Sequence, residues 1–193
     1  MKHLFLTILG VITFVTSYAQ SSILDNSTVK TKGGAELSLF HSYRNGEYYS
    51  SIHEFYWDYS KKVHFFTVEN KFGNFKADLK TLLTKYKEWE RTAKTNRVQF
   101  VEKEMPCNIG FTVLSNDEIS NPTQSVLKTY FVVSDYVPKC EIRMWQYYYS
   151  EVAYHVWKLT SEDIQAIINH MDLSLQDYIK IRTEKKRTED LFK

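Results

Sequence analysis

The sequence predicts an α+β fold in a single domain, and three observations lead to that class. Aromatic residues make up 16% of the chain, with 14 tyrosines and 12 phenylalanines, and such side chains favour pleated strands. Several apolar runs are bounded by turn residues, as antiparallel strands are. Two further segments repeat apolar residues at the spacing of an amphipathic helix. We therefore expect a twisted, mainly antiparallel sheet of about seven or eight strands, with one inserted helix and two short C-terminal helices.

The N-terminus has the pattern of a signal peptide over residues 1–19. A short basic start is followed by an apolar run over 4–15, and Ser17-Tyr18-Ala19 supplies small residues at a cleavage site. The apolar run has about twelve residues, fewer than the roughly twenty that cross a bilayer. We expect a mature chain that starts at Gln20, has no transmembrane segment and is exported to the periplasm or the extracellular space. The alternative is a retained N-terminal helix.

The rest of the chain has the length and charge of one ordinary domain. Residues 20–34 are small and polar and are expected to form a flexible lead, and residues 35–193 the single domain. The chain has 25 basic and 23 acidic residues. A protein that binds nucleic acid usually has a basic excess or a basic stripe, so we expect no nucleic-acid partner.

The two cysteines, Cys107 and Cys140, suggest one disulfide, because an exported chain meets an oxidising compartment. The bond would close a loop of about 34 residues and stabilise the fold by roughly 3–4 kcal/mol in the chain-entropy model. The alternative is two separately buried thiols.

The first expected hairpin joins a strand over 36–43 to a strand over 47–58. Asn45-Gly46 lies between them, and both positions of a type I′ turn need a positive φ, which these residues tolerate. The pairs that follow from this loop are Arg44 with Glu47, Tyr43 with Tyr48, Leu39 with Ile52, and His41 with Ser50.

A second turn at Ser60-Lys61 would lead into a strand over 63–69. A two-residue loop there places Trp57 opposite His64 and Phe55 opposite Phe66. Neither face of the resulting sheet is plainly polar. The sheet is therefore covered on both sides, or curls, or exposes a contact surface.

A helix is expected after Gly73-Asn74, which supplies a break and a cap. Its basic and acidic residues gather on one side and its apolar residues on the other, which indicates that it covers one side of the sheet. The apolar positions are Phe75, Leu79, Leu82, Leu83, Tyr86, Trp89 and Ala93.

Short strands are expected over 98–105 and 109–114, and three longer strands between Lys128 and Lys158. The C-terminal part is helical. Thr160 and Asp163 form a capping-box variant, and Ser174 to Asp177 repeats the cap pattern, which predicts a second helix.

The sequence carries no catalytic, cofactor or metal motif. It has no HExxH or GxSxG spacing and no phosphate-binding glycine loop, and the paired strands bring no two histidines together. We therefore expect no metal and no cofactor. Glu54, Asp58 and Glu141 lie on expected strands, and because carboxylates can meet in space, a hydrolase remains an alternative.

One strand face is the strongest candidate for binding. With Ser150-Glu151 as the turn, one face is apolar enough to be core, and the other collects aromatic rings and two basic residues. Arg143 would lie directly opposite Lys158, a repulsive pair that suits solvent or an anionic partner. The alternative is that the C-terminal helices cover this face. The residues of the candidate face are Arg143, Trp145, Tyr147, Tyr149, Tyr154 and Lys158.

Aromatic and arginine side chains are enriched at protein interfaces, and aromatic rings also suit sugars. We therefore expect an exported, non-catalytic binding protein that engages a protein or a glycan, for which an immunity- or inhibitor-like role is one specific form. The alternatives are an envelope hydrolase with strand-borne carboxylates and a structural or assembly subunit.

Overall fold

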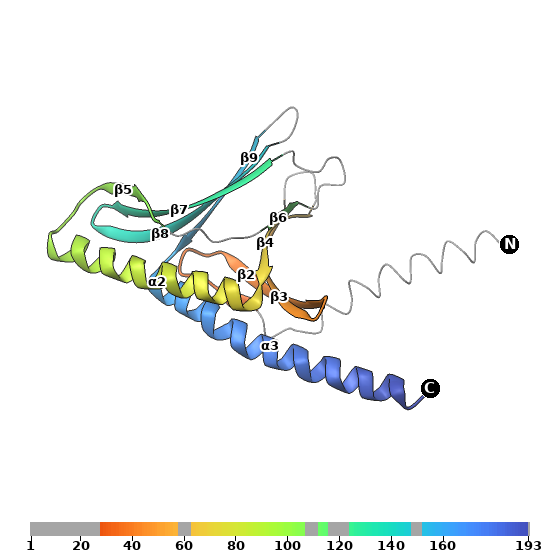
Figure 1. Cartoon of the computed structure of the whole chain (residues 1–193). Coiled ribbons are helices and arrows are strands. Elements are labelled where there is room, and N and C mark those ends of the chain that lie inside the picture. Colours follow the sequence, from red (N-terminus) through yellow and green to blue (C-terminus); the bar gives the residue numbers. More distant parts are fainter. Residues whose placement is uncertain (1–27, 58–62, 107–111, 116–123, 148–151, 193) are drawn as a thin grey trace.

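The computed structural model describes residues 28–57, 63–106, 112–115, 124–147 and 152–192, and it confirms the α+β class. Two antiparallel sheets and two helices form the fold (Figure 1). The strands are β1 (Thr28–Lys30), β2 (Glu36–Arg44), β3 (Glu47–Trp57), β4 (Val63–Lys71), β5 (Val101–Glu104), β6 (Thr112–Ser115), β7 (Gln124–Ser134), β8 (Val137–Tyr147) and β9 (Val152–Leu159), and the helices are α2 (Phe72–Thr95) and α3 (Ser161–Asp190).

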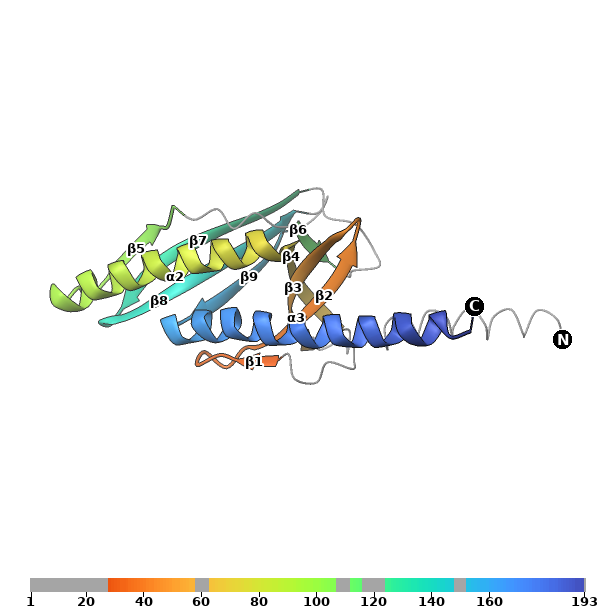
Figure 2. The same ribbon diagram turned by 60° about the horizontal axis from the view of Figure 1, so that its bottom comes forward.

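The single sheet expected from the sequence is wrong, because the described strands form two sheets. Their orders are β1-β2-β3-β4-β6 and β5-β7-β8-β9. Helix α2 connects β4 of the first sheet to β5 of the second, and β6 then returns to the first sheet. Helices α2 and α3 lie side by side on one side of both sheets (Figure 2). A strongly twisted sheet of many strands commonly splits in this way, since two smaller sheets can both cover the same helices.

The first hairpin has the predicted register. Tyr43 pairs with Tyr48 and Leu39 with Ile52 across β2 and β3. The loop residues Asn45 and Gly46 have φ of 52° and 83°, as a type I′ turn requires. Strand β1 lies within the stretch 20–34 that was expected to be a flexible lead, so the folded part of the chain extends at least to Thr28.

The register predicted between β3 and β4 is wrong by one residue. Phe55 pairs with Phe65, and Ile52 pairs with Val68. A shift of one residue exchanges the two faces of a strand, and here it places Val68 in the core beside Ile52, where both are 2% exposed. The connection 58–62, on which the prediction rested, lies outside the described residues.

The predicted apolar face of α2 is confirmed, and Trp89 packs partly buried against the same core. In place of two short C-terminal helices, α3 is one continuous helix of 30 residues. It begins with the predicted capping box, in which the Thr160 side chain accepts a hydrogen bond from the Asp163 N–H and the Asp163 carboxylate accepts one from the Thr160 N–H. Ser174 does not cap a second helix, because its hydroxyl donates to the His170 carbonyl at 2.6 Å inside α3.

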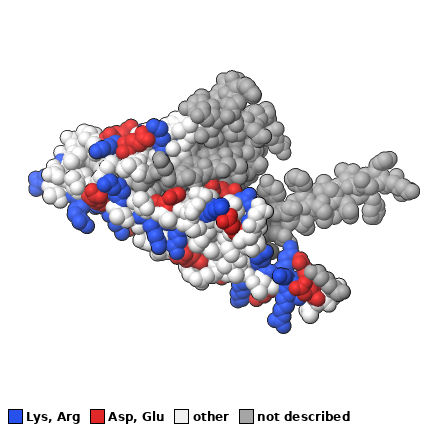
Figure 3. All heavy atoms as spheres, viewed as in Figure 1, with Lys and Arg blue, Asp and Glu red and all other residues white. Residues whose placement is uncertain are grey.

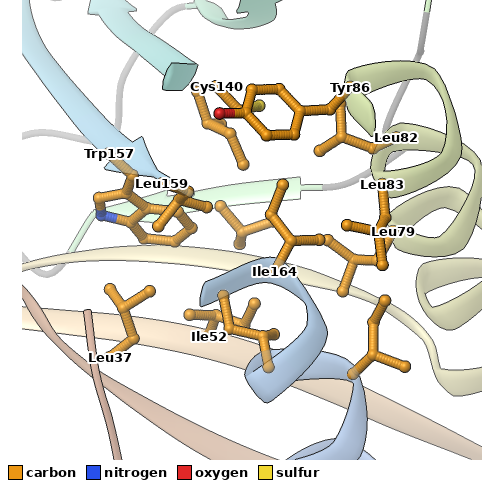
Figure 4. Packing of buried hydrophobic residues seen from close by; sticks show 14 of the residues in the cluster. Leu37, Ile52, Leu79, Leu82, Leu83, Tyr86, Cys140, Trp157, Leu159 and Ile164 are labelled. Atoms are coloured by element: carbon orange, nitrogen blue, oxygen red, sulfur yellow. The ribbon is translucent and has the colours of Figure 1, made fainter. Parts of the chain in front are cut away.

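One hydrophobic core lies between the helices and the two sheets (Figure 4). Trp157 is 2% exposed, and burying a side chain of this size stabilises the fold by roughly 2–3 kcal/mol. The largest fully buried side chains are Trp157, Tyr86, Phe75, Leu37, Leu39, Ile52, Leu79, Leu82, Met144, Leu159, Ile164 and Ile167.

No disulfide is seen among the described residues. Cys140 is completely buried at the start of β8, and Cys107 lies outside the described residues. The predicted signal peptide over 1–19 also lies outside them and stays a prediction. In the part of the chain that the structure describes, no helix has the length and apolar character needed to cross a membrane.

Candidate functional site on the second sheet

The four candidate residues whose side chains the structure describes, Arg143, Trp145, Tyr154 and Lys158, lie on the side of the second sheet that points away from both helices. Side chains alternate along β8 and β9, so Met144 and Trp157 point into the core while Trp145 and Tyr154 point outward. Tyr154 is 51% exposed. Helix α3 packs on the opposite, core side of the sheet, so it does not cover this side in the manner that the sequence left open.

We call this side of the sheet the outer face. It is formed by outward-pointing side chains of β5, β7, β8 and β9, which carry aromatic rings at one end and charged groups toward the other. The described side chains of this face are Glu102, Glu104, Val126, Lys128, Tyr130, Val132, Lys139, Glu141, Arg143, Trp145, Tyr154, Val156 and Lys158.

The aromatic end of the outer face is a row of three side chains on three neighbouring strands. Val126 pairs with Trp145, and Trp145 pairs with Tyr154. The two ring centroids are 5.2 Å apart with an angle of 38° between the ring planes. Trp145 is the less exposed of the two, and its ring packs beside the exposed Tyr154 ring.

The register predicted between β8 and β9 is wrong by two residues, which leaves every side chain on its predicted face. Trp145 lies opposite Tyr154 instead of Val156. The expected repulsion between Arg143 and Lys158 is therefore absent, because Arg143 lies opposite Val156 and Lys158 lies opposite Glu141. The connection 148–151 lies outside the described residues.

Arg143 is the centre of an ion-pair network on the outer face. Its Nη1 and Nη2 donate to the two carboxylate oxygens of Glu102 at 2.9 and 2.8 Å, and its Nε and Nη2 donate to Glu141 at 2.9 and 2.7 Å. The guanidinium carbon lies 4.2 Å from the centre of the Tyr130 ring. Four of the five N–H groups of Arg143 therefore have carboxylate acceptors.

The contact between Arg143 and Glu102 shifts the pKa of both groups. The hydrogen bonds to Glu102, followed by those to Glu141, raise the pKa of Arg143, and the same contact lowers the pKa of Glu102. Next to this network Lys128 donates to Glu104 at 2.9 Å. Acidic and basic groups lie beside one another over the region of β5 and β7 in Figure 3, with no dominant sign.

Two of the six predicted residues fall partly or wholly outside the described part. Tyr147 belongs to β8 and pairs with Val152, but its side chain is not described. Tyr149 lies in the connection 148–151. The structure therefore brings together Arg143, Trp145 and Tyr154 on one face, with Lys158 exposed near the other end of β9.

Sequence reasoning missed a polar cluster between the two sheets. Glu54 on β3 accepts hydrogen bonds through Oε2 from the Trp157 Nε1 at 2.6 Å and from the His155 Nε2. The Glu54 and His155 side chains are 15% and 22% exposed. The signal in the sequence is a polar residue at an inward position of each strand, between apolar neighbours two residues away, but nothing in the sequence pairs the two strands.

A second polar cluster fastens α3 to the first sheet. His41 Nδ1 lies 2.8 Å from Ser50 Oγ, and His41 Nε2 lies 2.7 Å from Ser174 Oγ. Burial lowers the pKa of His41 to about 4, so the ring is neutral at neutral pH. Both serines are buried, which indicates a structural role for this cluster.

Among the described residues no group of three or more histidine, cysteine, aspartate or glutamate side chains is placed to hold a metal ion. The chain matches no known family model, no curated protein and no solved structure at a significant level.

Proposed function

We propose that the protein is an exported, non-catalytic binding protein that engages a protein or glycan through the outer face of the second sheet. The observation that carries this proposal is the exposed Trp145–Tyr154 pair, which points away from both helices. An immunity- or inhibitor-like role in the cell envelope is a specific form of it.

Physical reasons favour contact with a partner at this end of the face. A tyrosine ring that is 51% exposed and held in place by a neighbouring tryptophan loses little conformational freedom when a ligand packs on it. Aromatic residues are enriched among the side chains that contribute most to binding energy. Next to this end, Arg143 is paired with Glu102 and Glu141 and Lys128 is paired with Glu104, while Lys158 is exposed further along β9.

Capture from envelope extract tests this proposal. Wild type is compared with Tyr154→Ala and with Trp145→Ala, and the matched control is Tyr136→Ala, since Tyr136 is 58% exposed in the turn between β7 and β8. We expect wild type and Tyr136→Ala to recover the same material and the other two variants to lose it. Equal recovery by all four folded proteins would contradict the proposal.

A hydrolase is the second candidate, and the hydrogen bond between His155 and Glu54 is the observation that favours it. A carboxylate next to a histidine is a common arrangement for moving a proton during hydrolysis. The test is release of soluble sugars or peptides from purified envelope by wild type and by Glu54→Gln. If wild type releases no more than buffer does, this candidate is wrong.

A further inference from the structure

We propose that helix α3 has two states and that protonation of His41 selects between them. In the state described above, α3 is one continuous helix. In the other state, which forms when His41 gains a proton, α3 breaks before Ser174 and residues 174–190 leave the β2–β3 hairpin. We call residues 174–190 the distal part of α3. The inference concerns the first sheet and is independent of the outer face.

The two parts of α3 are held to the rest of the protein in different ways. The buried side chains of α3 all lie between Ser161 and Ser174. From Leu175 onward the described side chains of α3 are half-buried or exposed, and from position 180 onward all of them are exposed. The end of α3 extends beyond both sheets (Figures 1 and 2). The distal part can therefore move without opening the hydrophobic core.

Side chains of the β2–β3 hairpin hold the distal part in place. Ser174 Oγ lies 2.7 Å from His41 Nε2, and the centre of the Tyr178 ring lies 6.2 Å from that of His41. Further along the helix, the guanidinium carbon of Arg182 lies 3.7 Å from the centre of the Tyr43 ring. Ser174 and His41 are 4% and 9% exposed, so their contact is a buried attachment of the distal part to the sheet.

The hydrogen bonds of His41 fit a neutral ring. The Ser174 hydroxyl donates its proton to the His170 carbonyl at 2.6 Å, so its oxygen accepts the Nε2–H of His41. Nδ1 of His41 then accepts from the Ser50 hydroxyl at 2.8 Å. A second ring proton, on Nδ1, would remove this acceptor and would leave a buried charge at the attachment.

Among the described residues, no carboxylate contacts the His41 ring. The rings of Phe72 on α2 and Tyr178 on α3 pack against it. A backbone hydrogen bond with Tyr49 favours the charged ring, but burial outweighs it and lowers the pKa of His41 to about 4. The titratable and charged side chains further away on these elements are Tyr43, Tyr48, Lys76, His170, Asp172, Asp177 and Arg182.

The sequence of α3 supplies the second conformation. Ser174 and Asp177 have the spacing of a capping box, and Leu173 and Tyr178 have that of a hydrophobic staple. The continuous helix uses neither pattern, because Ser174 is bonded to His41 and Leu173 is 60% exposed. In the broken helix the Ser174 hydroxyl accepts from the Asp177 N–H, and Leu173 packs on Tyr178. The break therefore replaces the contacts that it removes.

Proton binding favours the broken state because departure of the distal part lets water reach the His41 ring. The ring then has its ordinary pKa of 6.5, compared with about 4 in the continuous state. The open state thus binds the proton more tightly, and lowering the pH between these values shifts the equilibrium toward it. At about pH 4.5 the shift is on the order of 10- to 100-fold relative to neutral pH.

Residue-resolved hydrogen exchange of the full chain tests this inference. Rates are measured by NMR at neutral pH and at about pH 4.5, and each is corrected for the intrinsic rate at that pH. In the continuous helix the N–H groups of Leu175 and Gln176 bond the carbonyls four residues earlier, and a break before Ser174 removes these acceptors. These two amides are the readout, and the Ile168 amide in the first part of α3 is the reference.

We expect acid to speed exchange at Leu175 and Gln176 in wild type by about tenfold or more relative to the reference amide. His41→Gln cannot gain the proton, and its rates should change less than about twofold. Asp177→Ala removes the cap of the broken state and should show a smaller rise than wild type. The matched control is Glu184→Ala, which removes an exposed acid outside the cap pattern and should behave as wild type.

Each other result overturns a part of the inference. No rise in wild type overturns the second state. A rise of the same size at Ile168 shows loosening of the whole protein and overturns the break before Ser174. Equal rises in wild type and His41→Gln overturn His41 as the trigger, and equal rises in Asp177→Ala and Glu184→Ala overturn the capped second helix. If His41→Gln does not fold, the other comparisons use folded proteins altered only on the exposed side of α3 and still decide.

Discussion

At the residue scale, Arg143 determines the character of the outer face. Its side chain is 15% exposed, and it holds Glu102, Glu141 and the Tyr130 ring together from three strands. The planar guanidinium forms these contacts at once, which an ammonium group cannot do. The arginine is thus part of the structure of the face. Its charge is paired with Glu102 and Glu141 of the same chain, and the anionic partner expected from the sequence is not needed to pair it.

Replacing Arg143 with lysine should lower the free energy of unfolding by about 1–2 kcal/mol, because the paired hydrogen bonds to Glu102 and the stacking on Tyr130 are lost. Urea denaturation measures this change. Lys128→Ala serves as the comparison, since it removes an exposed ion pair and should change stability by less than about 0.5 kcal/mol. Equal effects of the two substitutions would contradict the structural role of Arg143.

The burial of His41 makes the stability of the protein depend on pH. The folded protein binds a proton at His41 only below about pH 4, whereas the unfolded chain binds one below about pH 6.5. The unfolded state therefore holds more protons in this window, and stability falls as the pH is lowered through it. His53 has a pKa that burial lowers in the same direction, to about 4, and adds to the same loss.

We expect the free energy of unfolding to fall by about 2–3 kcal/mol through His41 alone between neutral pH and about pH 4.5. Denaturant titrations of wild type and His41→Gln at both pH values measure it, because the variant lacks this titration. The decisive quantity is the difference between the two pH values within each protein. Identical differences in wild type and variant would contradict the burial of a neutral His41.

At the scale of elements, local sequence patterns predicted most helices and strands. They failed to predict helix length and strand register where contacts between residues far apart in sequence determine them. The apolar spacing of α2, the capping box of α3 and the Asn45-Gly46 turn depend on residues close in sequence, and all three are confirmed. Inside the continuous helix α3, Ser174 meets His41 from another element, and no local pattern reveals that contact. The registers across β3–β4 and β8–β9 depended on turn lengths that the sequence left open.

Two glycines should respond in opposite directions to alanine. Gly46 has a φ of 83° and Gly73 lies in the first turn of α2, and an added Cβ would meet no atom within 4 Å at either. Gly46→Ala should destabilise by about 1 kcal/mol because of the positive φ, and Gly73→Ala should stabilise by about 0.5–1 kcal/mol. Thermal unfolding of both variants checks the signs, and two changes of the same sign would contradict the assigned turn or helix.

At the scale of the whole molecule, the two sheets are the feature that the sequence did not predict. Strands in either sheet have the same local pattern of apolar and turn residues, so the pattern cannot say which strands share a sheet. What joins the sheets is the shared core and the hydrogen bonds of Glu54 on β3 with His155 and Trp157 on β9. Arg143, Trp145, Tyr154 and Lys158 still share one side of the sheet, because a register error of two residues preserves the alternation.

The inter-sheet cluster can be tested through Glu54. Glu54→Ala should lower the free energy of unfolding by about 2–4 kcal/mol, because the Trp157 N–H and the His155 ring lose a partly buried acceptor. Glu54→Gln keeps an acceptor oxygen and should recover most of the loss. Glu36→Ala, which removes an exposed ion pair on the same sheet, should cost less than about 0.5 kcal/mol, and a similar small cost for Glu54→Ala would contradict a role in joining the sheets.

The central claim is that the Trp145–Tyr154 end of the outer face is a contact surface. Oxidative footprinting of tyrosines, with and without envelope extract, tests it most directly, because Tyr154 and Tyr136 are 51% and 58% exposed and react in the same molecule. The account predicts that the extract slows oxidation of Tyr154 and leaves Tyr136 unchanged. Oxidation of Tyr154 at the same rate with and without extract would contradict it.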